Sequence, residues 1–389
     1  MLGLFVHDHK FPMNDSEYYN SYGFDKEFFN RYLSIFGNLA VIGREKNIEK
    51  KDTNKIEAID SSVDFYTIKN LKQLGNKKIR EEIDQKIIDS DYLVVRLPSI
   101  LGLYAIMKAK KFKKPYLIEV VGCPWDALSN KGFSKLLPAY VVTYLTKKAI
   151  YSAKYVVYVT EEFLEKRYPT KGKYIACSNV TLSEVNECDL NSRLEKIVDK
   201  NRTGKIILGT CATIDVIYKG QQDVIKAISR LKKEGYEIEY QLVGGGDPNF
   251  LENEALKYGV LEEVKFIGSL DHAEVFDWLE EIDIYVHPSK QEGLSRAIIE
   301  SMSKACPVFS ADAGGIHELI DEEFIFDKGS IDQICNIYKK FSINIMKEQA
   351  TLNQNNSKKY LKSVLYNRRK QFFKEYISDS RNYDLESNL

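Results

Sequence analysis

Residues 281–320 are the stretch that most narrows the folds open to this chain. Two short apolar runs, 282–286 and 307–310, have the length and composition of buried strands. Glu292 opens a segment of helical spacing after the first run, and a second helix is predicted from Ile316 after the second. The order strand, loop, helix, strand, loop, helix predicts a parallel α/β sheet.

Two glutamates follow the first of these strands. Ligands of open α/β sheets lie beyond the carboxyl ends of the strands, and Glu292 and Glu300 fall there, eight residues apart. Eight helical residues rise about 12 Å, the span from the sugar to the ribose of a nucleotide-sugar. Taken alone, two such glutamates are usually a helix cap and a solvated face. The strand before them and the glycines around them favour a ligand site with free N–H groups at the helix start.

The pattern resembles the E-x7-E signature of the family 4 retaining glycosyltransferases, of the glycosyl transferases group 1 type. The resemblance extends with gaps over residues 205–320. It implies the GT-B fold, with two Rossmann-like domains that face a cleft and a C-terminal helix that crosses back to the first domain. It also implies that the acceptor binds the first domain and a nucleoside diphosphate-sugar the second.

The chain length of 389 residues suits two domains, and both halves show the alternating α/β plan. We predict an acceptor-binding domain over residues 1–180, a linker with a short helix over 181–204, and a donor-binding domain over 205–355. Residues 356–389 then form the returning helix and the tail.

The balance of 56 basic and 56 acidic residues argues against a nucleic-acid-binding protein. Six cysteines without a C-x-x-C pair are typical of reduced thiols, and no apolar run has the length of a signal peptide or a membrane span. We therefore expect a cytoplasmic protein, and a location at the inner face of the membrane is an open alternative.

The first half offers three candidate contacts to the acceptor or the sugar. His7 and His9 follow the first strand in what is predicted to be a loop over residues 7–23, where they are either sugar contacts or ordinary polar loop residues. A metal site is disfavoured, because an H-x-H pair lacks a third ligand. Many members of the resembling family carry a histidine in the loop after the strand at 116–121. Here Asp126 or Glu119 would substitute for it, or the contact would be missing.

The second half contains one candidate basic residue for contact with the donor diphosphate. Lys219 stands where a Lys-Gly pair of the resembling family contacts the donor diphosphate, although a single lysine at a helix start is usually solvated. Many members add an arginine in a G-R-L triplet, but the corresponding triplet at 209–211 reads Gly-Thr-Cys. Lys219 is then the predicted cation beside the leaving group.

The remaining donor contacts are backbone contacts. Gly244 lies in a glycine-rich turn that lets the backbone approach a ligand, and in the family the backbone at Gly268 borders the base. Free N–H groups are expected in the segment that joins the two glutamates, at Gly293, Leu294 and Ser295.

Residues 136–150 are apolar and end in Lys147 and Lys148. They predict either a core helix interrupted by Pro138 or a surface that meets a membrane or a lipid-linked acceptor. Further lysines over 108–114, and Lys131 and Lys135, would attract anionic lipid in the second case.

The predicted function is transfer of a sugar, with retention, from a nucleotide-sugar to a hydroxyl of a glycan or lipid-linked glycan. Glu292 and Lys219 are the predicted catalytic residues. No cofactor is expected, and no metal, since no Asp-x-Asp pair ends a predicted strand. Two alternatives stay open: a GT-B type nucleotide-sugar epimerase, and a non-catalytic binding partner in polysaccharide assembly.

Overall fold

The computed structural model describes residues 1–389 except 22, 54–55, 130–135, 181 and 387–389. It contains two compact units. The first comprises Met1–Cys177 and Tyr366–Leu389, and the second comprises Ser178–Leu365.

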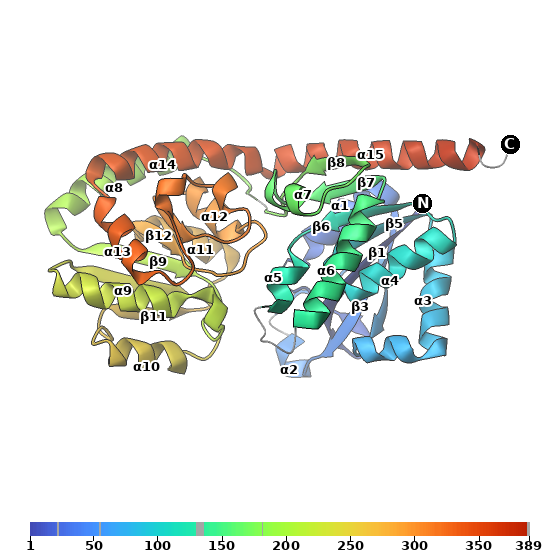
Figure 1. Ribbon diagram of the computed structural model, residues 1–389, viewed down its shortest axis with the longest axis horizontal. Coiled ribbons are helices and arrows are strands. Elements are labelled where there is room, and N and C mark those ends of the chain that lie inside the picture. Colours follow the sequence, from blue (N-terminus) through green and yellow to red (C-terminus); the bar gives the residue numbers. More distant parts are fainter. Residues whose placement is uncertain (22, 54–55, 130–135, 181, 387–389) are drawn as a thin grey trace. The chain divides into compact units, whose positions relative to one another are not determined.

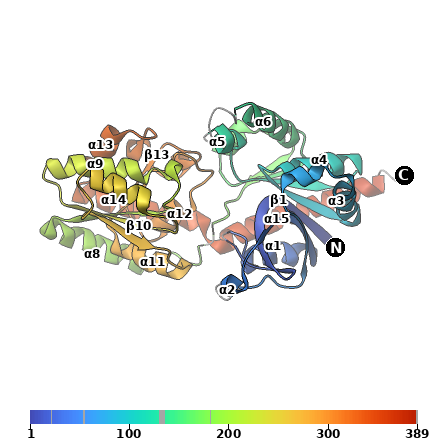
Figure 2. The same ribbon diagram turned by 90° about the horizontal axis from the view of Figure 1, so that it is seen from below.

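The first unit is a parallel sheet with helices on both faces. The strand order is β4-β3-β1-β5-β6-β7-β8, and β2 pairs antiparallel with β1. Figure 2 shows α3, α4 and α6 over one face of this sheet and α1 with α15 over the other. The bounds are β1 (Leu2–Asn14), β2 (Glu17–Tyr18), α1 (Lys26–Phe36), β3 (Asn38–Asn47), α2 (Lys50–Thr53), β4 (Val63–Ile68), α3 (Lys77–Asp89), β5 (Tyr92–Leu97), α4 (Ile100–Lys111), β6 (Tyr116–Val120), α5 (Pro124–Ser129), α6 (Leu136–Tyr151), β7 (Tyr155–Tyr158), α7 (Phe163–Arg167), β8 (Lys173–Ala176) and α15 (Lys362–Glu386).

The predicted loop over residues 7–23 is wrong in its first half, because β1 continues to Asn14. After a register shift beyond Val6, Lys10–Met13 pair with Arg44–Asn47 of β3. Phe11 is fully buried and anchors this extension against Phe24 and Phe65. The polar residues of this stretch are typical of a loop, but they belong to a strand whose inward side chains are aromatic.

A buried ion pair crosses the middle of the first sheet. Arg96 on β5 donates to Glu119 on β6 at 2.7 Å, and Tyr32 of α1 donates to the same carboxylate at 2.8 Å. The guanidinium of Arg96 lies 4.7 Å from the ring centroid of Phe28 and 5.3 Å from that of Phe24. The charge is therefore enclosed by one carboxylate and by aromatic faces.

Helix α15 belongs to the first unit from Tyr366 onward and runs beside β7 and β8 (Figure 1). Phe373 and Tyr376 are buried, and the Tyr376 hydroxyl donates to the carbonyl of Leu93. The predicted return of a C-terminal helix to the first domain is confirmed by these contacts.

The second unit is a parallel sheet of order β11-β10-β9-β12-β13-β14. Figure 2 shows α9 and α13 on one side of it and α8 and α11 on the other. The bounds are α8 (Glu187–Thr203), β9 (Ile206–Cys211), η3 (Ile217–Lys219), α9 (Gln221–Lys233), β10 (Ile238–Val243), α10 (Asn249–Lys257), β11 (Val264–Gly268), α11 (His272–Glu281), β12 (Ile284–His287), α12 (Arg296–Ser303), β13 (Val308–Ala311), η4 (Ile316–Glu318), η5 (Glu322–Phe324), β14 (Ile325–Phe326), α13 (Ile331–Lys340) and α14 (Ile343–Ser357).

Three local expectations for this half need correction. Residues 181–204 hold the 17-residue helix α8, which packs on α14 within the second unit. The predicted helix from Ile316 is a three-residue 3-10 turn. Helix α12 begins at Arg296 with Ser295 as its N-cap, so Glu292 lies in a loop and the two glutamates are not spaced by eight helical residues.

Candidate active site

The loops that follow β9 and β12 carry the candidate catalytic residues. The two strands are parallel neighbours, so both loops leave the same edge of the sheet. Gly220, just after Lys219, has φ +78°, and a Cβ there would lie 2.1 Å from the carbonyl oxygen of Pro288. The glycine therefore allows the two loops to make contact, and this contact places Lys219 next to Glu292.

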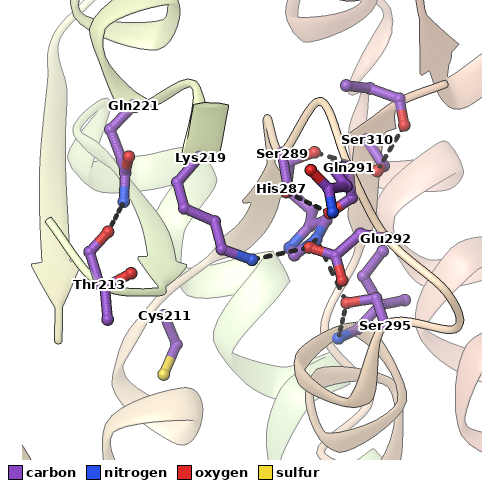
Figure 3. A network of polar contacts seen from close by, with 12 residues as sticks. Cys211, Thr213, Lys219, Gln221, His287, Ser289, Gln291, Glu292, Ser295 and Ser310 are labelled. Atoms are coloured by element: carbon purple, nitrogen blue, oxygen red, sulfur yellow. Dashed lines mark hydrogen bonds and ion pairs between the residues drawn. The ribbon is translucent and has the colours of Figure 1, made fainter. Parts of the chain in front are cut away.

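Lys219 and Glu292 form an ion pair that His287 shares (Figure 3). Lys219 Nζ lies 2.9 Å from Glu292 Oε1, and His287 Nε2 lies 3.1 Å from the same oxygen. The side chains of Lys219 and Glu292 are 21% and 15% exposed, and His287 is buried. Lys219 is thus held against a carboxylate and is not the solvated lysine common at helix starts.

The charge of Glu292 is fixed by its neighbours. Burial alone would raise the pKa of this carboxyl, but His287 and then Lys219 outweigh burial and hold the pKa well below its usual range. Glu292 is therefore ionised at neutral pH. A buried, ionised carboxylate with two cationic or hydrogen-bonding partners has a fixed direction, which suits it to orient a ligand hydroxyl.

Glu300 lies on α12, close to the same edge. Its carboxylate Oε1 is 3.4 Å from Nε2 of His272, an exposed residue in the first turn of α11. Burial and the charge of Glu300 raise the pKa of the Cys211 thiol to about 12, so Cys211 is a neutral thiol beneath Lys219 (Figure 3). Cys211 therefore contributes no charge beside Lys219.

The segment between the two glutamates is anchored at both ends. The Ser295 hydroxyl accepts from the N–H of Ile298 and lies 3.3 Å from Nε2 of His287. The carbonyl of Gly293 accepts from the N–H of Gly315, while Leu294 beside it is partly exposed. The path of the backbone from Glu292 into α12 is thus set by protein contacts.

The predicted glycine contacts lie at the next strands of the same sheet. Gly244 follows β10, and its N–H donates to the carbonyl of Gly268 at the end of β11. Gly244 has φ +148°, and a Cβ would lie 2.0 Å from the carbonyl oxygen of Ala212. A side chain at this position would force the β9 and β10 loops apart.

His7 and His9 lie in β1, where both rings stack on Phe24. His7 Nδ1 is 3.2 Å from the carbonyl oxygen of Arg96, and His9 Nε2 is 2.7 Å from the hydroxyl of Ser21. Burial, followed by nearby arginine charge, lowers the pKa of His7 to about 3 and that of His9 to about 4. Both rings are neutral at pH 7. They can therefore form hydrogen bonds with the acceptor substrate, but they carry no positive charge.

Asp126 and Glu119, the two proposed substitutes for the family histidine, differ in their surroundings. Asp126 lies in the first turn of α5, with its side chain 21% exposed and Oδ1 3.4 Å from Nη2 of Arg167. Glu119 is buried and committed to Arg96. Asp126 is therefore the one of the two that keeps access to solvent, and its contact with a sugar stays a prediction.

Two residues of the candidate site were not predicted from the sequence. His287 had no predicted role, although it is the last residue of β12 and so stands at the ligand-facing edge of the sheet. His272 also had no predicted role, and its partner Glu300 is 28 residues away in sequence. The position of His287 was a usable signal, whereas the His272 contact required the packing of α11 beside α12.

The residues that the structure describes contain no group of three or more His, Cys, Asp or Glu side chains arranged to hold a metal ion.

Known proteins resemble this chain in sequence and in fold. The family model described as glycosyl transferases group 1 matches residues 195–359. Protein CapJ of Staphylococcus aureus is 33% identical over 391 residues, which cover 97% of this chain and 96% of CapJ. The amylovoran biosynthesis glycosyltransferase AmsK of Erwinia amylovora is 36% identical over 110 residues, or 26% of this chain and 27% of AmsK.

Among solved structures, Anabaena HepE in complex with UDP-glucose superimposes with a TM-score of 0.65 at 18% identity. The match covers 97% of this chain and 100% of HepE. WaaG, a glycosyltransferase involved in lipopolysaccharide biosynthesis, gives 0.63 at 14% identity over 96% of this chain and 99% of that one. The predicted GT-B class, with two Rossmann-like domains and a C-terminal helix, is confirmed.

Proposed function

This chain belongs to the glycosyl transferases group 1 family, and from that premise we propose that it is a retaining, metal-independent glycosyltransferase. The donor is a nucleoside diphosphate-sugar, and the acceptor is a hydroxyl of a glycan or lipid-linked glycan. Cell-surface polysaccharide synthesis is the proposed setting, supported by the similarity to AmsK, an amylovoran biosynthesis glycosyltransferase.

One observation carries the proposal: a lysine and a glutamate from neighbouring strand ends meet at the ligand-facing edge of the second sheet. The Glu292 carboxylate is the anion that lies beside Lys219 in the structure. A diphosphate is a stronger competitor for that cation because it carries more charge. Donor binding is then an exchange, in which Lys219 turns to the phosphates and His287 continues to hold Glu292.

Each residue of the candidate site then has a proposed role in binding or transfer. Glu292 accepts hydrogen bonds from sugar hydroxyls, and Glu300 accepts them from the ribose. Lys219, together with backbone N–H groups of Gly293, Leu294 and Ser295, stabilises the negative charge that develops on the departing diphosphate. Gly244 and Gly268 border the nucleotide, and His7, His9 and Asp126 contact the acceptor or the sugar. No cofactor takes part in this scheme.

A test of the donor site is the affinity of the Glu300→Ala variant for a nucleoside diphosphate. Loss of charge-assisted hydrogen bonds to the ribose should weaken binding by about 1.5–3 kcal/mol, measured by calorimetric titration of UDP, GDP and ADP. Glu262→Ala, which removes an exposed glutamate elsewhere in the second unit, is the matched control. Equal affinities of the Glu300→Ala variant and the wild type would reject the ribose assignment.

A further inference from the structure

Helix α6 in the first unit shows an apolar face to solvent. Its outward side chains are large and follow helical spacing, with exposed fractions of 74%, 66%, 46%, 57% and 44%. Single exposed apolar residues are ordinary, but a contiguous stripe of this kind marks an interaction surface. We call this stripe the α6 surface, and it consists of Leu137, Tyr140, Val141, Tyr144 and Leu145.

The α6 surface corrects the first interpretation of residues 136–150, that of a core helix interrupted at Pro138. Pro138 is the third residue of α6, where a backbone N–H would have no partner within the helix, so the helix runs unbroken to Tyr151. The inward face is narrow and is made largely of small residues such as Ala139 and Ala149. The helix is therefore apolar on both faces, and only the inner one is covered.

A basic cluster ends the apolar stripe. It consists of four exposed lysines: Lys110, Lys147, Lys148 and Lys171. Lys110 Nζ donates to Ser152 at 2.6 Å, which ties the end of α4 to the end of α6. The Ser152 hydroxyl in turn donates to the carbonyl of Lys148, and Lys171 Nζ lies 4.8 Å from the ring centroid of Tyr151, so the four lysines lie around the end of α6. Across the described part of the chain, no carboxylate lies within ion-pair distance of any of the four.

The combination of stripe and cluster points to one kind of partner. Leucine and valine partition into the boundary between headgroups and acyl chains, and tyrosine places its ring there with the hydroxyl toward water. Lysines beside such a stripe meet anionic phosphates, and here they have no competing carboxylates. A patch of one sign of charge beside an apolar stripe matches the negative surface of a bilayer that contains anionic lipid.

We propose that the α6 surface and the basic cluster together dock the first unit onto a bilayer that contains anionic phospholipid. Helix α6 has 16 residues, too few to cross the hydrocarbon layer, so it lies along the interface. Nowhere in the described residues is there a helix long and apolar enough to span a membrane. Lys131 and Lys135, once predicted to add to the attraction, lie outside the described residues.

This inference goes beyond the transfer reaction and does not depend on it. Docking is a property of the first unit, whereas the donor site lies in the second. If the donor proposal failed and the docking proposal held, the chain would bind vesicles without binding nucleoside diphosphates, so the two can fail separately.

The test is co-sedimentation of the full chain with vesicles of phosphatidylcholine alone or mixed with phosphatidylglycerol. The wild type should sediment with the mixed vesicles and remain in solution with phosphatidylcholine alone. In the Lys147→Glu/Lys148→Glu variant, partition onto mixed vesicles should fall roughly tenfold or more, because each lysine near an anionic surface contributes on the order of a fivefold gain.

The apolar part of the surface is tested by Leu137→Glu/Tyr144→Glu, which should abolish sedimentation. Leu256→Glu, at an equally exposed leucine of α10 in the second unit, is the matched control and should sediment like the wild type. A melting curve for each variant shows that it is folded. If the Leu137→Glu/Tyr144→Glu variant does not fold, the Lys147→Glu/Lys148→Glu variant still tests the proposal.

Two results would overturn the proposal. One is vesicle binding that does not follow the α6 surface, seen either as a wild type that stays in solution or as variants that bind like the wild type. The other is a wild-type dimer on size exclusion that Leu137→Glu/Tyr144→Glu converts to monomer without changing sedimentation, because a second copy of the chain would then cover the α6 surface.

Discussion

Replacing Lys219 by alanine is expected to lower the turnover number by on the order of a hundredfold, comparable to the loss of one preorganised donor at an oxyanion site. The transition state places negative charge on the departing phosphate, so a cation there stabilises the transition state more than the bound donor. The triplet at 209–211 lacks the arginine that would share this task. Lys219→Arg should restore activity only in part, since the two cations differ in geometry.

The measurement is steady-state donor turnover on purified variants, with Lys233→Ala as a matched control at an exposed lysine that ends α9. Melting curves should show little change, because Lys219 is partly exposed and Glu292 keeps His287 as a partner. A folded Lys219→Ala variant with near-normal turnover would mean that the diphosphate is held elsewhere, by Arg296 or by backbone N–H groups alone.

The largest effect on stability is expected from the buried carboxylate of the first unit. Glu119→Leu should lower the free energy of unfolding by about 3–5 kcal/mol, because Arg96 would be left buried without its counter-charge. The loss is enlarged by Arg31 and Arg369, whose charges also act on Glu119. The double variant Arg96→Met/Glu119→Leu should lose less than Glu119→Leu, since it removes both charges.

Acid should remove the same contribution in the wild type. Burial would raise the pKa of Glu119, but Arg96, Arg369 and Arg31 lower it from 4.5 to about 2 in the folded chain. A depressed folded pKa stabilises the fold above the unfolded pKa, and this contribution is lost as pH falls from about 4.5 toward 2.

Denaturant titrations at pH 7 and pH 3 provide the measurement. The double variant should lose less stability over this range than the wild type, since it no longer carries the carboxylate. Equal losses in the two proteins, or a Glu119→Leu variant as stable as the wild type, would contradict the role assigned to the ion pair.

The strands of the second unit could be predicted from the sequence because they are short, apolar and separated by glycine turns. The strands at 282–286 and 307–310 were predicted within two residues of β12 and β13. The extension of β1 was not predicted, since His7, Asp8, His9 and Lys10 interrupt the apolar pattern. Its pairing with β3 and the cover of Phe24 decide the structure there, and both are tertiary contacts.

The candidate site shows the same limit. Glu292 was predicted from the strand and helix around it together with the family resemblance, and Lys219 from the Lys-Gly pair of the resembling family. Their ion pair was not predicted, because it joins residues 73 positions apart. The exposed face of α6 was likewise one of two interpretations, because an apolar run does not reveal how much of it the neighbouring elements cover. Burial of each face, and not composition, decides between them.

The second unit is expected to bind a nucleoside diphosphate at the Lys219–Glu292 edge without a metal ion. The most direct measurement is the melting temperature of the full chain in EDTA with saturating UDP, GDP, ADP, CDP or TDP. At about 100 times the dissociation constant, one of them should stabilise the fold by roughly 2.7 kcal/mol and raise the melting temperature by several degrees. A melting temperature that none of the five changes in EDTA would contradict the claim.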